Sequence, residues 1–173
     1  MRAFITVGST RFDELIQAIF STSVLHSLSN KGYTELVVQC GYSSFPYDYL
    51  LAHGELSFKV QEEGVFIECW KFRPALETEY EQADLVISHA GSGTIVDVLR
   101  MNKPLIVVPN STLLDDHQQE LAAALEKLNH LRSSTISSLA TTIQEFDPSS
   151  FTKFPPFAGD KFRDLVDEEM GFA

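Results

Sequence analysis

Cysteine and basic residues are scarce in this sequence of 173 residues. The two cysteines, Cys40 and Cys69, each lie in an apolar run, which favours buried free thiols and a cytosolic compartment over a disulfide framework. Lysine and arginine together number 13 against 24 aspartates and glutamates, and the formal net charge is −11. Because binding to a phosphate backbone or to anionic lipid needs clustered basic side chains, we expect no nucleic-acid partner and no direct adhesion to such a membrane.

Long apolar runs are missing as well. No stretch approaches the ~20 residues of a membrane-spanning helix, and no long apolar core precedes Gly8, so we expect no signal peptide. The sequence shows no internal repeat. Apolar residues nevertheless make up 44% of the chain, which is typical of a globular domain with a substantial core.

Short apolar runs predict the strands of a sheet. The runs at 84–88 and 105–108 are apolar at consecutive positions, as expected for parallel strands that are covered on both faces. The runs at 57–61 and 65–70 are joined by a tight segment that contains Gly64, which predicts an antiparallel hairpin. The other strands expected are residues 1–7 and 35–40.

Helical spacing of apolar residues separates these strands, which predicts an α/β fold with a mostly parallel sheet. We expect a helix that Asp13 caps and that stops at residues 30–32. Pro74 suits the first turn of a helix that runs to Gln82. A further helix is expected after residue 94, with Ile95, Val98 and Leu99 facing the core. Another is expected from residue 115, with Leu121, Leu125 and Leu128 facing the core. A last one is expected over residues 138–146.

Residues 84–119 carry the strongest functional pattern, DLVISHAGSGTIVDVLRMNKPLIVVPNSTLLDDHQQ. In this pattern, a strand leads into a turn of small residues, Gly91, Ser92, Gly93 and Thr94, and a helix follows. We call this turn the second glycine loop, because an earlier glycine-containing turn lies at residues 8–10. Free N–H groups and the positive dipole end make such a helix start a natural anion site. The glycines let a phosphate approach the backbone, and Ser92 and Thr94 add hydroxyl donors.

Polar residues beyond this loop strengthen the pattern. Asp97 lies about one helical turn past the glycines and has a carboxylate suited to a ribose diol. Asp116 and Gln119 resemble a capping box, which is a structural role, whereas Gln118 is free to serve a ligand. Two adjacent strands would therefore present polar helix starts at their carboxyl edge, where open α/β sheets bind ligands.

The motifs HAGSGT…D…KPLIVVPN…DDHQQ resemble the C-terminal, donor-binding half of glycosyltransferase family 28. Within the family, the motifs resemble those of the catalytic subunit of the eukaryotic two-subunit UDP-N-acetylglucosamine transferase, which makes the second sugar addition to the dolichol-linked oligosaccharide. The resemblance is strongest over residues 84–120 and extends to residues 4–10. It implies a Rossmann-like half of a GT-B glycosyltransferase, with a mostly parallel sheet and an antiparallel hairpin.

The resemblance also implies which residues bind the UDP-N-acetylglucosamine donor. The first glycine loop (Gly8, Ser9, Thr10) would face the diphosphate, although a plain tight turn is the alternative for it. Phe72 and Arg73 match the loop at the uracil ring, and ordinary loop packing is the alternative for Phe72. The remaining donor-binding candidates are Gly91, Ser92, Gly93 and Thr94, Asp97 at the ribose, Gln118 and Gln119 at the sugar hydroxyls, and Asp116 beside them.

Two histidines, His89 and His117, stand at the predicted cleft. Either can pair with phosphate or act as a general base, and for His89 a strand-end residue bonded to backbone is an equal alternative. The departing UDP develops negative charge, which must be stabilised by a metal or by fixed dipoles. No Asp-x-Asp cluster follows a strand, so we expect no metal and no cofactor. We expect the helix starts at the two glycine loops to stabilise the charge on the departing UDP instead.

One lobe of a two-lobed transferase is predicted here, over residues 1–146. The resemblance implies that a membrane-anchored subunit supplies the acceptor lobe and recruits this chain to the cytosolic face of the endoplasmic reticulum. Residues 147–173 are expected to form an extension, with an aromatic and proline-rich strip at its start. Its final amphipathic helix, which we expect to contact the partner, would present Phe162, Leu165, Val166 and Met170.

Two other function classes remain open at this stage. A non-catalytic nucleotide-sugar sensor could be built on the same half-fold, and only transfer activity with a partner separates it from an enzyme. An NAD-type oxidoreductase is disfavoured, because Val96 replaces the third glycine of the G-x-G-x-x-G motif and the glycines come late in the chain.

Overall fold

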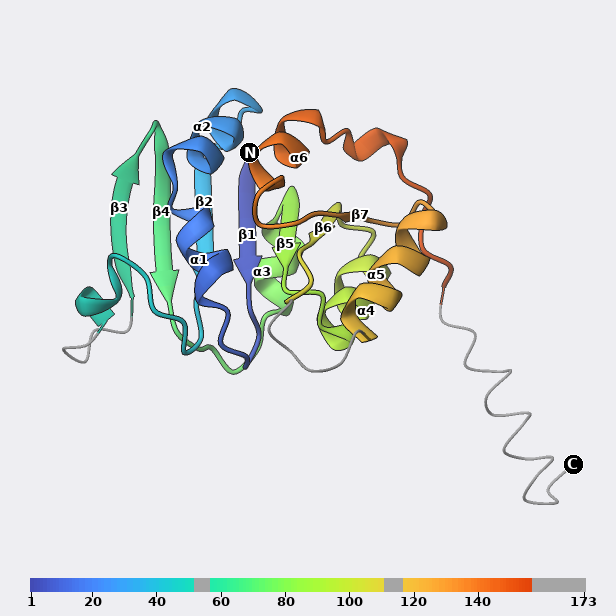
Figure 1. The fold of residues 1–173 in the computed structure, drawn as a ribbon, viewed down its shortest axis with the longest axis horizontal. Helices are drawn as coiled ribbons and strands as arrows, with labels where there is room; N and C mark the ends of the chain where they lie inside the picture. Colours follow the sequence, from blue (N-terminus) through green and yellow to red (C-terminus); the bar gives the residue numbers. More distant parts are fainter. Residues whose placement is uncertain (52–56, 111–116, 157–173) are drawn as a thin grey trace, which may run out of the picture.

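The computed structural model describes residues 1–51, 57–110 and 117–156, and Figure 1 shows their arrangement. A seven-stranded sheet forms the centre, in the order β3-β4-β2-β1-β5-β6-β7. Its strands are β1 (Arg2–Thr6), β2 (Glu35–Gln39), β3 (Phe58–Glu62), β4 (Val65–Trp70), β5 (Leu85–Ser88), β6 (Leu105–Val107) and β7 (Arg132–Ser133). The helices are α1 (Asp13–Ile19), α2 (Thr22–Asn30), α3 (Glu77–Gln82), α4 (Ser92–Arg100), α5 (His117–Lys127) and α6 (Leu139–Glu145), with 3-10 turns η1 (Asp48–Leu51) and η2 (Pro148–Ser150).

The predicted α/β class is confirmed. Every strand pair in the sheet is parallel except β3 with β4, which form the expected antiparallel hairpin. The hairpin turn uses Glu63 and Gly64, both with positive φ, as a tight connection between twisted strands requires. The two-residue strand β7 was not predicted, because a pair of polar residues carries no apolar pattern.

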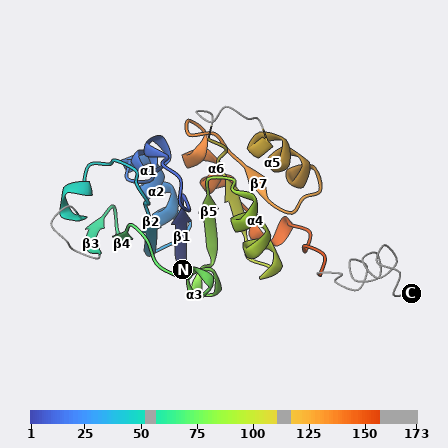
Figure 2. The same cartoon turned by 90° about the horizontal axis from the view of Figure 1, so that it is seen from below.

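Helices cover both faces of the sheet, and each face has its own apolar core (Figure 2). The side chains of α1, α2 and α6 pack with alternate residues of the strands in the larger core. On the opposite face, α3 and α4 pack with the remaining strand residues, among them Phe4 and Trp70. The predicted core face of α4, Ile95, Val98 and Leu99, is buried there. Burial on both faces explains why the central strands are apolar at consecutive positions.

The helix expected between residues 13 and 30 is in fact two helices. The backbone of Ser21 is extended, and its hydroxyl accepts a hydrogen bond from the N–H of Val24, which starts α2 as a new helix. Asp13 is the first residue of α1 and not its cap. Its carboxylate instead accepts hydrogen bonds from Arg11 and from the N–H of Ser44.

Two smaller expectations also differ from the structure. The helix assigned to residues 74–82 begins only at Glu77, so Pro74 lies before its first turn. Leu128, expected on the core face of its helix, is 60% exposed, because α5 ends at Lys127 and the chain turns at Asn129, which has positive φ. Ala122 is the buried residue of α5.

The aromatic strip after residue 150 packs, where described, on its own domain. The ring of Phe151 lies 5.1 Å from that of Phe146, and the ring of Phe154 lies 5.3 Å from that of His130. Both phenylalanines are partly buried against the two cores. The predicted terminal helix and its four apolar residues lie outside the described residues. Within the described part of the chain, no helix is long and apolar enough to cross a membrane.

Candidate active site

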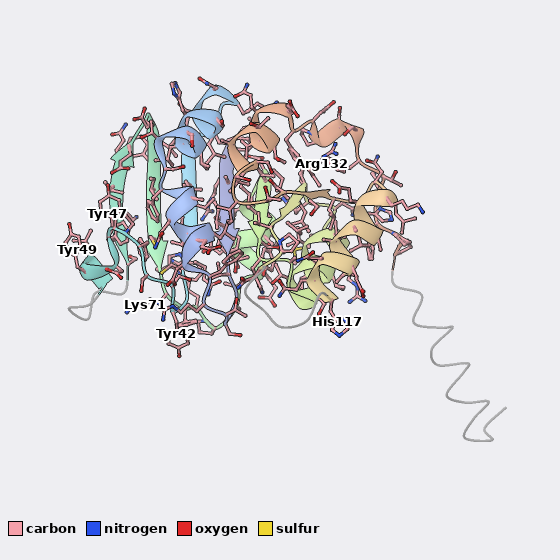
Figure 3. All side chains as sticks on the ribbon, viewed as in Figure 1. Tyr42, Tyr47, Tyr49, Lys71, His117 and Arg132 are labelled. Carbon is pink, nitrogen blue, oxygen red and sulfur yellow. The ribbon has the colours of Figure 1, made fainter. Side chains whose placement is uncertain are left out.

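The candidate residues gather where the parallel strands end. Figure 3 shows Tyr42, Lys71 and His117 along this edge of the sheet, at the bottom of the view. The carboxyl ends of β1 and β5 lie side by side there, since Thr6 is the register partner of Ser88. The two glycine loops follow these two strands directly. The topology therefore brings together turns that are about 80 residues apart in the sequence, at the edge where open α/β sheets bind ligands.

The second glycine loop is an open helix start. Gly91 is the N-terminal cap residue of α4, in an extended conformation, and no side chain from the described part of the chain caps the helix. The first N–H groups of an α-helix have no partner within the helix, so they are available to a ligand. A β-carbon placed on Gly93 would meet no atom within 4 Å. The loop thus offers free donors and open space, the combination that an anion needs.

The first glycine loop is a turn that the protein itself holds in place. Gly8 has a φ of 60°, and its N–H donates to the Thr6 hydroxyl at 3.0 Å. Thr10 donates through both its N–H and its hydroxyl to the carbonyl of Val7. Ser9 is exposed. A helix start was expected at this loop, but α1 begins only at Asp13, so the loop lies before the helix and not at its N-terminus.

The His89 ring fits between the two loops. Its Nδ1 lies 3.4 Å from the carbonyl of Thr6, and because a carbonyl only accepts, the proton of the neutral ring is on Nδ1. A β-carbon on Gly8 would come within 2.9 Å of His89 Cε1, and one on Gly91 within 2.5 Å of Nε2. Both glycines are therefore required by the packing of this ring. Burial, at 6% exposure, lowers the pKa of His89 below its usual value.

His117, the second candidate base, has a different environment. It is the first residue of α5, its side chain is 85% exposed, and its Nδ1 lies 3.8 Å from Glu120. The buried His89 is bonded to backbone, as the structural alternative for it required. An exposed histidine at the rim can exchange protons with solvent, whereas an enclosed one mainly sets the positions of its neighbours. The assignment of the base between the two stays a prediction.

Asp97 presents an exposed carboxylate on α4, about one turn beyond Gly93. Among the described residues it makes no ion pair and no hydrogen bond through its side chain. Ser92 is likewise exposed, while Thr94 is half-buried. Burial raises the pKa of Tyr80, and the Thr94 hydroxyl acts on that pKa in the opposite direction. The predicted ribose carboxylate therefore has no partner among the described residues, and Ser92 is the more exposed of the two loop hydroxyl residues.

The two glutamines of α5 differ in whether a protein group already engages the side chain. Gln118, expected to be free for a ligand, accepts a hydrogen bond at its Oε1 from the N–H of Asn110 at 3.1 Å. This bond occupies part of its amide and connects the start of α5 with the end of β6. Gln119 is exposed. Asp116 and its proposed capping box lie outside the described residues.

Phe72 and Arg73 follow β4 at the same edge. Phe72 is 45% exposed, and its ring lies 4.8 Å from that of Tyr42, which is 70% exposed. The Arg73 guanidinium, in contrast, is engaged. It contacts Glu79, donates to Glu68 at 2.7 Å, and stacks 4.3 Å from the centre of the Trp70 ring. Phe72 is thus available to a base, while Arg73 chiefly secures the loop.

Sequence reasoning missed two residues of this edge. Tyr42 pairs with Phe72 across two loops, and Asn110 connects Gln118 to the carbonyl of Arg11, at 3.5 Å. A single aromatic in a loop gives no signal of such a pairing, although Asn110 does end an apolar strand run. Across the described ranges, no group of three histidine, cysteine, aspartate or glutamate side chains is placed to hold a metal ion. Cys40 and Cys69 are buried free thiols, as expected.

Residues 2–168 match the model of the family described as glycosyltransferase family 28 C-terminal domain. The chain belongs to this family. The predicted resemblance is therefore confirmed over nearly the whole sequence, including segments where the motifs were weak.

Curated relatives bear the name UDP-N-acetylglucosamine transferase subunit ALG13. The protein from Cryptococcus neoformans (strain JEC21) is 33% identical over 191 residues, which cover 97% of this chain and 96% of the relative. The protein from Mus musculus is 37% identical over 130 residues, which cover 75% of this chain but only 10% of the relative. The chain therefore matches the fungal relative end to end and spans a small part of the mouse protein.

Solved structures agree with the fold. A solution structure of ALG13 superposes with a TM-score of 0.68 at 27% identity, covering 94% of this chain and 93% of that one. MurG from Acinetobacter baumannii superposes with a TM-score of 0.66 at 19% identity, covering 96% of this chain and 49% of that one. The present fold thus corresponds to about half of a two-lobed GT-B glycosyltransferase, as predicted.

Proposed function

We propose that this chain is the donor-binding subunit of an inverting UDP-N-acetylglucosamine transferase. It binds UDP-N-acetylglucosamine and transfers the sugar to dolichol-diphosphate-linked N-acetylglucosamine, the second step in assembly of the N-glycan precursor. Membership of the glycosyltransferase family and the subunit names of the relatives support this reading.

The observation that carries the proposal is the uncapped start of α4. No side chain among the described residues caps this helix start, a β-carbon on Gly93 would meet open space, and Asp97 is exposed four residues further along α4. A sugar nucleotide needs these features: donors for a diphosphate, a carboxylate for a ribose diol, and room for both. Fixed dipoles at the same helix start also stabilise the charge that develops on UDP as the bond to the sugar breaks.

The remaining donor groups are assigned by position around this start. The uracil ring is proposed to lie against Phe72 with Tyr42 beside it, both exposed at the same edge. The sugar hydroxyls are proposed to reach Gln118 and Gln119 at the start of α5. His117, whose side chain is 85% exposed, is the better placed of the two histidines to exchange a proton with an acceptor hydroxyl.

A partner completes the enzyme in this proposal. The relatives are named as subunits of a transferase, and the fold superposes on about half of MurG. We propose that a membrane-anchored subunit supplies the acceptor lobe and holds this chain at the cytosolic face of the endoplasmic reticulum. The tail is the proposed contact. Deleting residues 159–173 should abolish co-precipitation with the partner, while circular dichroism and UDP binding of the remaining domain persist.

The deciding experiment is transfer in a reconstituted system. The full chain is combined with its partner subunit, dolichol-diphosphate-linked N-acetylglucosamine and labelled UDP-N-acetylglucosamine, and the lipid product is separated by chromatography. A lipid carrying two N-acetylglucosamine units is expected, and UDP-glucose should give much less product. Binding of UDP-N-acetylglucosamine without any transfer would instead establish the chain as a nucleotide-sugar sensor.

A further inference from the structure

Gln39 is a buried polar side chain at the end of an otherwise apolar strand. It is the last residue of β2 and is 3% exposed. In the sheet register it lies beside Thr6 of β1 on one side and Trp70 of β4 on the other. A buried amide is costly unless its donors and its acceptor are paired. Its partners therefore show what this position requires.

The side chain of Gln39 joins three segments at the sheet edge. The Thr6 hydroxyl donates to Gln39 Oε1. Gln39 Nε2 donates to the carbonyl oxygen of Gly8 at 2.7 Å and to that of Lys71 at 3.0 Å. Because the Thr6 hydroxyl oxygen also accepts the N–H of Gly8, Gly8 is held through both of its backbone polar groups. The same amide holds Lys71, the residue before Phe72.

The chemistry of these partners requires a glutamine. Two carbonyl oxygens can only accept, so they need the two hydrogens of an NH2 group, and the hydroxyl can then donate to the amide oxygen. This reasoning also sets which way the amide points. An ionised glutamate has the same shape but no donor, and it would place a negative oxygen against two carbonyls.

We propose that Gln39 is a positioning residue that sets the separation between the first glycine loop and residues 71–73. These two segments form the walls of the nucleotide part of the site, so the inference rests on the proposed function for its ligand. Gln39 is buried, and its amide oxygen and its NH2 group are both bonded to protein groups. It acts by holding Gly8 and Lys71 at one spacing, so that the nucleotide finds both walls already in place. Preorganisation of this kind reduces the ordering cost of binding.

The test uses two substitutions and two matched controls in the full chain. Gln39→Glu keeps the shape and removes both donors, and Gln39→Met keeps an unbranched chain of similar length and removes all three bonds. Val38→Ala controls for lost stability, because Val38 directly precedes Gln39 on the same strand, is fully buried, and faces the core on the opposite side of the sheet. Gln61→Glu controls for the chemical change, because Gln61 is exposed on β3.

Two readouts separate positioning from general stability. Carbon resonances of the Gly8 and Lys71 carbonyls, measured by NMR without ligand, report the bonds that these oxygens accept. A titration with UDP then gives the dissociation constant of the folded protein. In both Gln39 variants we expect the two resonances to shift and the UDP dissociation constant to rise about tenfold, a change of the size expected for losing a pair of buried hydrogen bonds. Val38→Ala and Gln61→Glu should stay within about twofold of the wild type.

The results that would overturn the proposal are equally definite. Unshifted carbonyl resonances, or a UDP dissociation constant that rises no more than in Val38→Ala, would show that Gln39 does not set the spacing. Gln39→Met carries the test if the glutamate variant does not fold. Failure of the wild type to bind UDP would refute the proposed function instead, since the resonance shifts in the free chain still test the contacts of Gln39.

Discussion

The two glycine loops follow neighbouring strands at the same edge of the sheet, yet they are built in opposite ways. In the first, Gly8 has positive φ, and its N–H and carbonyl are bonded to Thr6 and Gln39. In the second, Gly91 opens α4 without a side-chain cap, and Gly93 faces open space. One loop is a tied turn and the other is an open helix start.

This difference shows that glycine serves two separate needs at one site. At Gly8 it allows a backbone conformation that other residues adopt only with strain. At Gly93 it leaves the backbone accessible to a ligand. The helix after the first loop begins with two acidic residues, Asp13 and Glu14, which suit the helix dipole but not a bound diphosphate. In the proposed function, the first loop is therefore better described as a wall of the site, and the second as its proposed anion-binding element.

The largest expected effect on stability comes from adding one methyl group to the first glycine loop, at Gly8. Gly8→Ala should destabilise the fold by about 1–2 kcal/mol for the left-handed conformation. The contact with the His89 ring, at 2.9 Å, should add roughly 1–3 kcal/mol of overpacking. Urea unfolding followed by circular dichroism measures the sum.

Gly93→Ala is the matched variant in the open loop. Because the site is helical and its surroundings are empty, we expect stability to be unchanged or to rise by up to about 1 kcal/mol. UDP binding should nevertheless weaken, since the new methyl group occupies the space assigned to the diphosphate. Equal destabilisation by the two substitutions would remove the contrast between the loops.

A second prediction sharpens the roles of the groups beyond the open loop. Asp97→Ala should weaken both UDP and UDP-N-acetylglucosamine about tenfold, or about 1.4 kcal/mol, because both ligands carry the ribose. Gln118→Ala should weaken the sugar nucleotide by a similar factor but spare UDP. Calorimetric titration of both ligands checks this. Identical losses for the two ligands in both variants would refute the division of roles.

The pH dependence of the free energy of unfolding should report on protonation of the His89 ring, which lies between the two glycine loops. Burial places the pKa of His89 below its usual value of 6.5, so the unfolded chain binds the proton first as the pH falls. The contribution of His89 to the free energy of unfolding is fully present above pH 6.5, and it declines as the pH drops toward the lower pKa of the folded state. His89→Gln should flatten that part of the curve, measured as the free energy of unfolding between pH 5 and 7.5. The same slope in the variant would assign it to other groups.

The smallest expected effect concerns metal. If the start of α4 carries the charge of the leaving UDP, adding EDTA to the reconstituted enzyme should change the transfer rate by less than about twofold, because fixed dipoles replace the cation. Loss of activity that magnesium or manganese restores would contradict this, and would point to a metal bound with the donor.

The sequence by itself determined the fold class, and it predicted that the ligand site lies at the carboxyl edge of the sheet. Consecutive apolar residues in the strand after Asp84 required burial on both faces, and Gly64 between two strand-like runs specified the hairpin. Both signals are local, because they depend on which faces of one strand are covered and on the conformation of one turn. The apolar spacing after the second glycine loop likewise specified α4, whose start is the proposed anion site.

Only the tertiary structure decided which polar groups are available at that site. Gln118 and Arg73 have the composition of ligand-binding residues, but Asn110 and a pair of glutamates engage them. The contacts of Gln39 and the position of the His89 ring join residues that lie 31 to 83 positions apart in the chain. No local pattern encodes such pairs, because they arise when the sheet order places β1 between β2 and β5 and brings the ends of these strands together.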